Sequence, residues 1–151
     1  MQSFAHFTPT PQKIVAQKPK TISSKEEFEV IKTHCMQGAS MLRRLENFED
    51  EPLLQTAYDI ARWHHERWDG RGYPDGLKGN DIPISAQIVS LADVYDALTS
   101  ERCYKKAFSH ETAMRMILNG ECGAFNPLLL ECLTDIQAEL QEKLQNITIN
   151  R

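Results

Sequence analysis

The chain has 151 residues, of which 41% are hydrophobic, and a formal net charge of −4 at pH 7, which suits one domain with an ordinary core. The mild negative charge argues against a protein that binds DNA through its overall charge. The chain has no apolar run long enough to span a membrane, no signal-peptide pattern and no Cys-x-x-Cys pair, so we expect a cytoplasmic protein with reduced thiols.

The first helix is predicted after a proline-containing connection that ends near Pro19. Ser23 and Ser24 each have a glutamate three residues later, so either serine fits an N-terminal capping box. Apolar residues then recur at helical spacing as far as Leu45, and His34 lies beside this stripe. A histidine at that position is either a residue at the edge of the core or a ligand.

A second helix is predicted from Pro52, because proline suits the first turn of a helix. Its inward stripe runs into the adjacent His64 and His65, whose side chains leave a helix about 100° apart. Such a pair can serve two neighbouring metal ions, or one ion and one substrate oxygen. The other interpretation is a pair of buried histidines with ordinary hydrogen-bond partners.

A loop rich in glycine and proline follows from Asp69 to Pro83, which excludes regular structure there. Loops of this length are often functional, because glycine lets the backbone approach a ligand and proline limits motion. Within this loop, the side chain of Tyr73 either packs in the core or provides a surface on which a ligand stacks.

A third helix is predicted over residues 84–100 by a wide apolar stripe, which indicates a helix largely surrounded by protein. Asp93 and Asp96 fall within that stripe, where a carboxylate requires a cation, hydrogen-bond donors or a capping role. The next segment contains Arg102 and Lys105, which fit either a phosphate site or a solvated basic surface.

Two further helices are predicted, one with Ser109 as its N-cap and one with Asn126 as N-cap and Pro127 in its first turn. The apolar stripe of the last helix continues as far as Leu144 and suits packing on the core or pairing with a second chain. Apolar and polar residues alternate, as they do in a β-strand, only over stretches of a few residues. The sequence therefore predicts an all-α fold, a bundle of about five helices.

The candidate metal centre combines three histidines and one carboxylate from three predicted helices: His34, His64, His65 and Asp93. Imidazole and carboxylate groups are suitable ligands for iron, manganese or zinc, and helical bundles hold such sites between facing helices. Two ions about 3.5–4 Å apart can activate water for attack on a phosphodiester.

The run from His64 to Pro74, His-His-Glu-Arg-Trp-Asp-Gly-Arg-Gly-Tyr-Pro, resembles the signature of the HD-GYP family, a branch of the HD-domain metal phosphohydrolases. Other segments follow the family's pattern as well: residues 31–34, 74–79, 82–83 and 88–99. The resemblance implies an HD-domain-like helical bundle. It also implies metal-dependent hydrolysis of bacterial cyclic di-GMP to linear pGpG and, in some members, GMP.

The resemblance also assigns roles to individual positions of this sequence. The implied metal ligands are His34, His64, His65 and Asp93, and no catalytic side chain is implied beyond them. Arg102 and Lys105 correspond to residues that hold substrate phosphate. Tyr73 belongs to the loop that flanks the substrate and has been linked to partner signalling domains. The other motif residues of this loop are Glu66, Asp69, Gly70, Gly72 and Pro74.

One part of the family pattern is absent, because this sequence contains no His-Asp pair at any position. Family members carry that doublet before the segment that corresponds to Pro11, and its aspartate bridges the metal ions. Counting back from Pro11 puts the doublet near Ser3 and Phe4. We therefore expect a partial site for a divalent metal (iron, manganese or another) and weak or no hydrolysis by the chain as given.

The resemblance implies three parts: residues 1–10 as a divergent or non-family start, 11–146 as the C-terminal portion of an HD-GYP domain, and 147–151 as a tail. We expect the N-terminal helices of the family to be missing. Their absence would leave apolar surface exposed and favour a homo-oligomer. The alternative to an impaired phosphodiesterase is a catalytically inactive signalling module that binds a nucleotide or a partner protein.

Overall fold

The computed structural model describes residues 25–45, 48–101 and 106–149. These residues form six α-helices and one short 3-10 helix, and no strand occurs among them, which confirms the all-α prediction. The helices are α1 (Lys25–Leu42), α2 (Pro52–Trp63), α3 (Ile84–Thr99), α4 (His110–Leu118), α5 (Pro127–Asp135) and α6 (Gln137–Ile149). None of these described helices combines the length and the apolar character that a membrane span requires.

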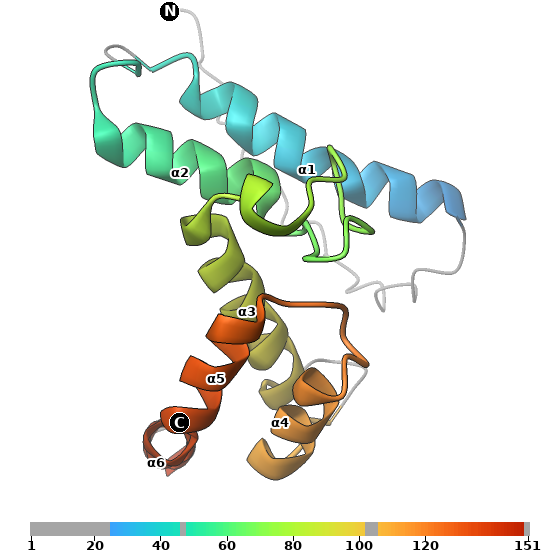
Figure 1. Cartoon of the computed structure of the whole chain (residues 1–151), viewed down its shortest axis with the longest axis vertical. Helices are drawn as coiled ribbons and strands as arrows, with labels where there is room; N and C mark the ends of the chain where they lie inside the picture. Colours follow the sequence, from blue (N-terminus) through green and yellow to red (C-terminus); the bar gives the residue numbers. More distant parts are fainter. Residues whose placement is uncertain (1–24, 46–47, 102–105, 150–151) are drawn as a thin grey trace, which may run out of the picture.

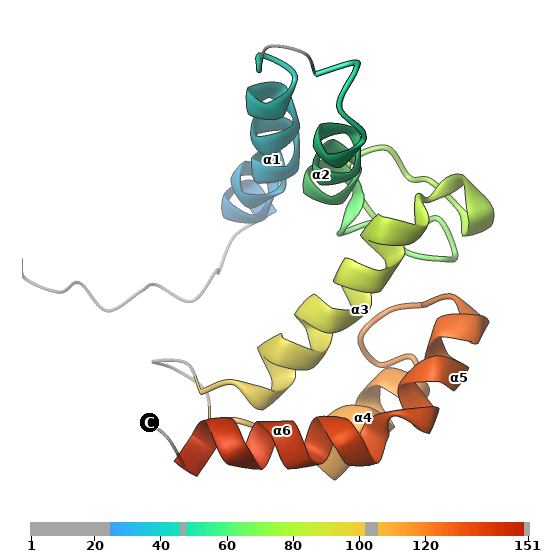
Figure 2. The same ribbon diagram turned by 90° about the vertical axis from the view of Figure 1, so that its left-hand side faces the viewer.

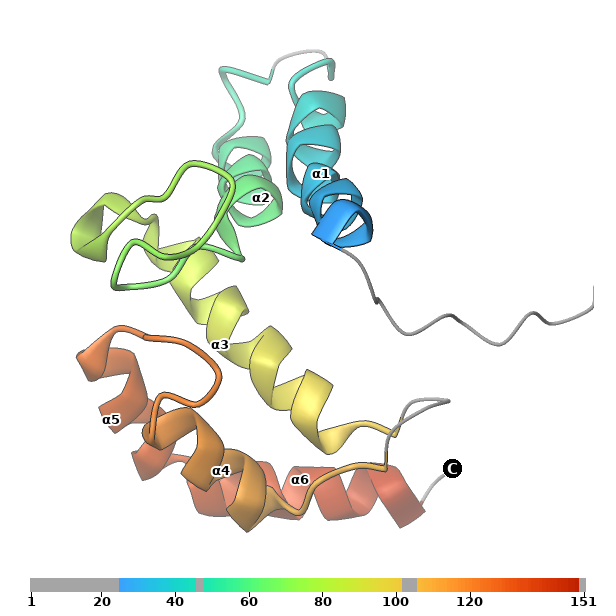
Figure 3. The same cartoon turned by 90° about the vertical axis from the view of Figure 1, so that its right-hand side faces the viewer.

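The helices form two groups that are joined by α3 (Figure 1). The antiparallel pair α1 and α2 lies near the start of α3, and α4 and α6 lie toward its other end, as the side views in Figure 2 and Figure 3 show. Helix α5 begins beside the first turns of α3, where the side chain of Asn126 donates a hydrogen bond to Gln87. The long loop after α2 lies between the two groups, beside the first turns of α3. The histidine segments predicted from the sequence therefore belong to the α1–α2 end of the molecule.

Helices α1 and α2 approach closely because small residues meet between them. A Cβ built at Gly38 on α1 would lie 3.5 Å from the Cβ of Ala61 on α2, and Ala39 is fully buried nearby. As predicted, Pro52 occupies the first turn of α2. The close approach brings the middle of α1 to the C-terminal end of α2, where the histidine doublet lies.

The loop after α2 is held by one buried carboxylate. Oε1 of Glu66 accepts hydrogen bonds from the backbone N–H groups of Asp75 and Gly76, at 2.7 and 3.0 Å. Gly72 passes so close to this segment that a Cβ there would overlap with the backbone of Glu66 and Arg67. The loop, which lies wholly within the described residues, contains no α-helix or strand, as its composition predicts, but it does contain one short 3-10 helix at Gly79–Asp81, which the prediction excluded.

The larger hydrophobic core lies between α3, α4 and α5 and consists of Leu91, Leu98, Ala113, Met114, Ile117, Phe125 and Leu133. The two predicted N-caps next to this core are confirmed. The Ser109 side chain accepts the N–H of Thr112 at the start of α4, and the Asn126 side chain accepts the N–H of Leu128 at the start of α5. Local capping therefore sets where both helices begin.

The last helix differs from the prediction, because its single apolar stripe is divided between two helices. Helix α5 ends at Asp135, and the N–H of Ile136 turns back to the carbonyl groups of Cys132 and Thr134. Helix α6 then starts at Gln137 and runs in a new direction (Figure 2). No glycine or proline marks this change, so the apolar periodicity gave no sign of it.

Helix α3 is also less enclosed than its wide stripe predicts. Ile84 and Ile88 are 57% and 51% exposed, and the carboxylates of Asp93 and Asp96 are exposed as well. The reason is that the described helices pack on only part of the α3 surface. The expectation of two buried carboxylates on this helix is therefore wrong.

Candidate metal centre

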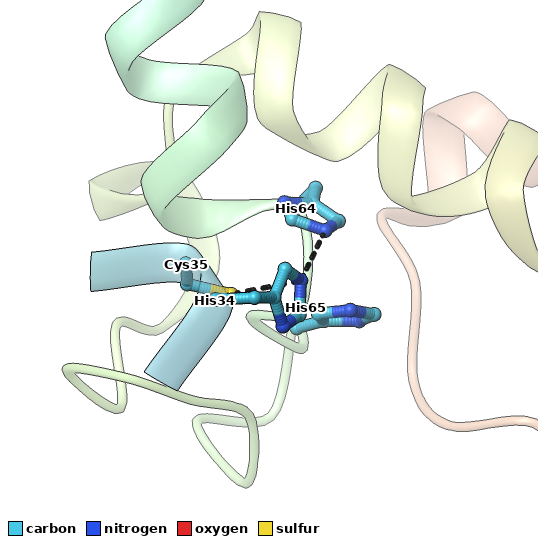
Figure 4. A group of neighbouring side chains, drawn as sticks. All are labelled: His34, Cys35, His64 and His65. Atoms are coloured by element: carbon cyan, nitrogen blue, oxygen red, sulfur yellow. Dashed lines mark hydrogen bonds between the residues drawn. The ribbon is translucent and has the colours of Figure 1, made fainter. Parts of the chain in front are cut away.

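Three of the four predicted ligands come together where the middle of α1 meets the end of α2 (Figure 4). His34 lies on α1, His64 caps the C-terminus of α2, and His65 begins the loop. One nitrogen from each imidazole and the sulfur of Cys35 all lie within 4.8 Å of one another. This group of side chains is called the histidine cluster below.

The imidazoles of His34 and His64 are each oriented by a backbone carbonyl of their own helix. Nδ1 of His34 lies 2.6 Å from the oxygen of Ile31, and Nδ1 of His64 lies 2.8 Å from the oxygen of Ile60. Because a carbonyl oxygen only accepts, each Nδ1 carries a proton, and the neutral form of each ring has its lone pair at Nε2. Metal-binding histidines are commonly oriented in this way.

The two Nε2 atoms of His34 and His64 face one another at 3.3 Å. In this tautomer neither atom can donate to the other, so a cation or an extra proton is needed between them. Two nitrogen ligands about 2.1 Å from one tetrahedral or octahedral ion lie about 3.0–3.4 Å apart. The spacing therefore fits a divalent ion held by both imidazoles.

His65 lies against its neighbour and against the loop. Its ring centroid lies 4.1 Å from that of His64. The ring centroid of Tyr73 lies 4.8 Å away on the loop, and the planes of the His65 and Tyr73 rings are inclined by 30°. Burial, followed by the charges of His64, His34 and Arg67, lowers the pKa of His65 to about 4. The imidazole is therefore neutral at pH 7, which is the form that binds metal ions.

Tyr73 fills the space between the loop and α1 and borders the histidine cluster. Its ring meets the edge of Phe28 at a centroid distance of 6.1 Å, and Nζ of Lys32 lies 5.6 Å from its centroid. Burial raises the pKa of Tyr73 to about 12, so its hydroxyl keeps its proton. The residue thus packs in the structure, with its ring beside that of His65.

Hydrogen bonds fix the chain on both sides of the histidine doublet. The guanidinium of Arg62 donates two hydrogen bonds to Asp75, at 2.8 and 2.9 Å, and the indole of Trp63 donates a third at 2.7 Å. On the other side, the half-buried Arg67 donates to the hydroxyl of Ser90 on α3 at 2.7 Å. Both histidines therefore lie between two anchored segments.

Asp93, the fourth predicted ligand, is not part of the histidine cluster. Its exposed side chain lies on α3, in electrostatic range of the loop. Burial is the main cause of the lowered pKa of Arg67 and the raised pKa of Tyr73, and the charge of Asp93 makes a smaller, upward contribution to both. Its assignment as a ligand stays a prediction. Arg102 and Lys105, the predicted phosphate-binding residues, lie outside the described residues.

The other motif residues shape the loop. The carboxylate of Asp69 accepts the N–H of Arg71 at 3.1 Å, Gly70 has a φ of 81°, and Pro74 follows a cis peptide bond. The sequence prediction did not include Cys35 in the centre. Its adjacency to His34 was the available signal, but spacing alone does not show that both side chains turn toward α2.

A family model described as an HD domain matches residues 6–124. A probable cyclic di-GMP phosphodiesterase of Vibrio cholerae is 44% identical over 108 residues, which are 70% of this chain and 24% of that protein. A cyclic di-GMP phosphodiesterase of Thermotoga maritima is 40% identical over 121 residues, which are 80% of this chain and 32% of that protein. A 3'3'-cGAMP-specific phosphodiesterase of Vibrio cholerae is 36% identical over 121 residues, which are 80% of this chain and 22% of that protein.

This chain thus spans between 22% and 32% of the length of these three relatives. The family match nevertheless covers most of the chain and includes α1, α2, α3 and the loop that carries the His64–Pro74 run. The chain belongs to the HD domain family, and its signature run assigns it to the HD-GYP branch.

Proposed function

We propose that this chain carries part of the metal centre of a bacterial cyclic di-GMP phosphodiesterase, with iron or manganese as the ion. The observation that carries the proposal is the convergence of two Nε2 lone pairs, from His34 and His64, at 3.3 Å. Two of the relatives described above are named for the same reaction, and a third is named for a related cyclic dinucleotide. The substrate class is therefore a cyclic dinucleotide.

A divalent ion bound here would act as a Lewis acid on a phosphoryl oxygen and would lower the pKa of a bound water. The chain's own contribution is a set of imidazoles whose orientation is fixed before substrate arrives. The carbonyl groups of Ile31 and Ile60 keep the lone pairs of two rings directed inward. Burial keeps His65 neutral, so a metal ion does not compete with a proton there at pH 7.

Substrate binding is proposed for Tyr73, Arg102 and Lys105. The ring of Tyr73 lies beside that of His65, and its hydroxyl, which keeps its proton, can donate to a phosphate oxygen. The two basic side chains add positive charge for the same phosphate. Asp93 is proposed as a further ligand from α3, since a carboxylate suits iron and manganese.

The test is an assay of the purified protein with cyclic di-GMP or 3'3'-cGAMP and added Mn²⁺ or Fe²⁺, with products separated by chromatography. We expect slow formation of pGpG from cyclic di-GMP, and a loss of about a hundredfold in rate for His64→Ala. His110→Gln, which removes an imidazole from the α4 core, is the matched control and should retain activity. Equal rates for His64→Ala and the unsubstituted protein would contradict the proposal.

The second candidate is a module that binds a cyclic dinucleotide without hydrolysing it. The observation in its favour is the absence of a His-Asp pair from the sequence, because a bridging aspartate is then missing. Calorimetric binding of cyclic di-GMP with no product under either metal would support this candidate. Turnover that disappears in His64→Ala would exclude it.

A further inference from the structure

We infer that Cys35 is a fourth ligand of the histidine cluster, so that three imidazoles and one thiolate surround a single ion, which can take up water or Asp93 as a fifth ligand. The inference rests on the proposed metal centre. It goes further by naming a donor that the family signature does not contain and by predicting which metal this particular chain prefers.

The first support is the position of the sulfur. Sγ of Cys35 lies 3.5 Å from Nε2 of His34 and within 4.8 Å of a ring nitrogen of both His64 and His65. Figure 4 shows the sulfur directed at the ring of His34, on the side where α1 faces the end of α2. All four donor atoms therefore surround one small region.

The second support is the agreement between two separations. A sulfur about 2.3 Å and a nitrogen about 2.1 Å from one tetrahedral ion lie about 3.6 Å apart, and two such nitrogens lie about 3.4 Å apart. The observed separations are 3.5 Å between Sγ of Cys35 and Nε2 of His34, and 3.3 Å between the Nε2 atoms of His34 and His64. One four-coordinate ion accounts for both distances.

The third support is charge. Three neutral imidazoles bring no negative charge to a divalent ion, and no aspartate of a His-Asp pair exists in this sequence to supply it. A thiolate at Cys35 supplies one negative charge from within the cluster. On binding, the S–H bond breaks, its proton passes to solvent, and a sulfur–metal bond forms.

A thiolate also changes the metal preference. Sulfur and nitrogen donors in tetrahedral geometry favour zinc and cobalt(II), whereas manganese prefers oxygen donors. We therefore expect the protein to bind Zn²⁺ more tightly than Mn²⁺ by a ratio that depends on Cys35. If the cysteine had only a structural role, its substitution would weaken the binding of Zn²⁺ and Mn²⁺ alike. A variant that loses the preference for Zn²⁺ over Mn²⁺ therefore indicates a ligand.

The experiment is a titration of the metal-free protein with Co²⁺, followed by absorption spectroscopy. The unsubstituted protein should show a thiolate-to-cobalt charge-transfer band in the near ultraviolet and the intense visible bands of tetrahedral cobalt. Cys35→Ser and Cys35→Ala should lose the charge-transfer band. Competition titrations should show Zn²⁺ affinity reduced about tenfold or more and Mn²⁺ affinity changed less than about threefold.

Cys132→Ser is the matched control, because Cys132 is an exposed thiol on α5, and this variant should keep the band. The alanine variant retains an apolar side chain at the fully buried position, and circular dichroism of the metal-free proteins verifies folding. Cobalt binding without a charge-transfer band in the unsubstituted protein would overturn the inference and leave the histidine centre intact. No cobalt binding at all would overturn both.

Discussion

Gly72 is the position at which packing leaves no room for a side chain. A Cβ there would overlap with the Cα of Glu66 and the backbone nitrogen of Arg67, which are backbone atoms and cannot rotate away. We expect Gly72→Ala to lower the free energy of unfolding by about 2–3 kcal/mol, because the loop must shift away from the histidine doublet. Urea denaturation monitored by circular dichroism measures this change.

Gly38→Ala is the matched control, since it makes the same chemical change at the α1–α2 contact. Its new methyl group would meet the Cβ of Ala61 at 3.5 Å, which is an ordinary contact distance. Alanine within a helix is favoured over glycine by about 0.5–1 kcal/mol, so this variant should be as stable as the unsubstituted protein or more stable. Equal destabilisation by both substitutions would show that the Gly72 contact is not the cause.

At the scale of elements, Asp75 attaches the loop to the last turn of α2. The hydrogen bonds from Arg62 hold the pKa of Asp75 below its ordinary value of 3.8. The folded state thus binds this proton less readily than the unfolded state, so the stabilisation is complete above about pH 4 and is lost as the pH falls through lower values. Asp75→Asn should cost about 1 kcal/mol at pH 7, since the pair is partly exposed.

Urea denaturation of Asp75→Asn and the unsubstituted protein, at intervals from pH 7 to pH 3, checks both parts of this expectation. The difference in unfolding free energy should shrink below about pH 4. Asp69→Asn is the control, because its ion-pair partner Arg71 is 88% exposed and the pair is 3.6 Å apart, and it should change stability by less than about 0.5 kcal/mol. A difference for Asp75→Asn that is constant over this pH range would exclude the ion pair as its source.

Three helix starts could be predicted from the sequence because they depend on residues next to one another, whereas the predicted caps of the first helix, Ser23 and Ser24, lie outside the described residues. Pro52, Ser109 and Asn126 each act within the first turn of their own helix, and each occupies its predicted place. The division between α5 and α6 could not be predicted, because apolar residues continue at helical spacing through Ile136. The exposed face of α3 was also hidden, since periodicity shows which residues are apolar but not how much protein covers them.

The candidate site could be predicted only in part, because it too depends on contacts between helices that the sequence pattern does not show. The resemblance identified His34, His64 and His65, whereas local pattern alone left core and ligand interpretations open for each. Their convergence depends on the contact between Gly38 and Ala61, which only the folded chain brings together. The direction of the Cys35 sulfur likewise follows from how α1 lies on α2.

At the scale of the whole molecule, the apolar surface left exposed on α3 and α5 bears on self-association. Ile84 and Ile88 on α3 and Leu128 on α5 are all more than half exposed. Exposed apolar residues that lie on neighbouring helices favour association with further protein surface. The predicted homo-oligomer stays a prediction, and sedimentation velocity over a wide concentration range should show a species larger than the monomer. A single monomeric species at every concentration would contradict it.

A metal ion should stabilise the whole molecule, because it would link α1 to the end of α2. Helix α1 packs chiefly on α2, and the cluster takes His34 from one helix and His64 from the other. An ion that binds only the folded state at a hundred times its Kd adds about 2.7 kcal/mol. For a chain of this size, that corresponds to a rise in Tm of about 5–11 °C, which scanning calorimetry with Zn²⁺ and then with a chelator can measure.

Two α1 variants separate this linkage from a general effect of metal on the protein. His34 is exposed, so His34→Ala should keep the Tm of the metal-free protein within about 2 °C and lose most of the response to Zn²⁺. Gln37→Ala alters another exposed residue of the same helix, one turn later and outside the histidine cluster, and should keep the full response. Since His34 is the imidazole that α1 contributes to the cluster, an undiminished Tm rise in His34→Ala would place the bound metal elsewhere in the chain.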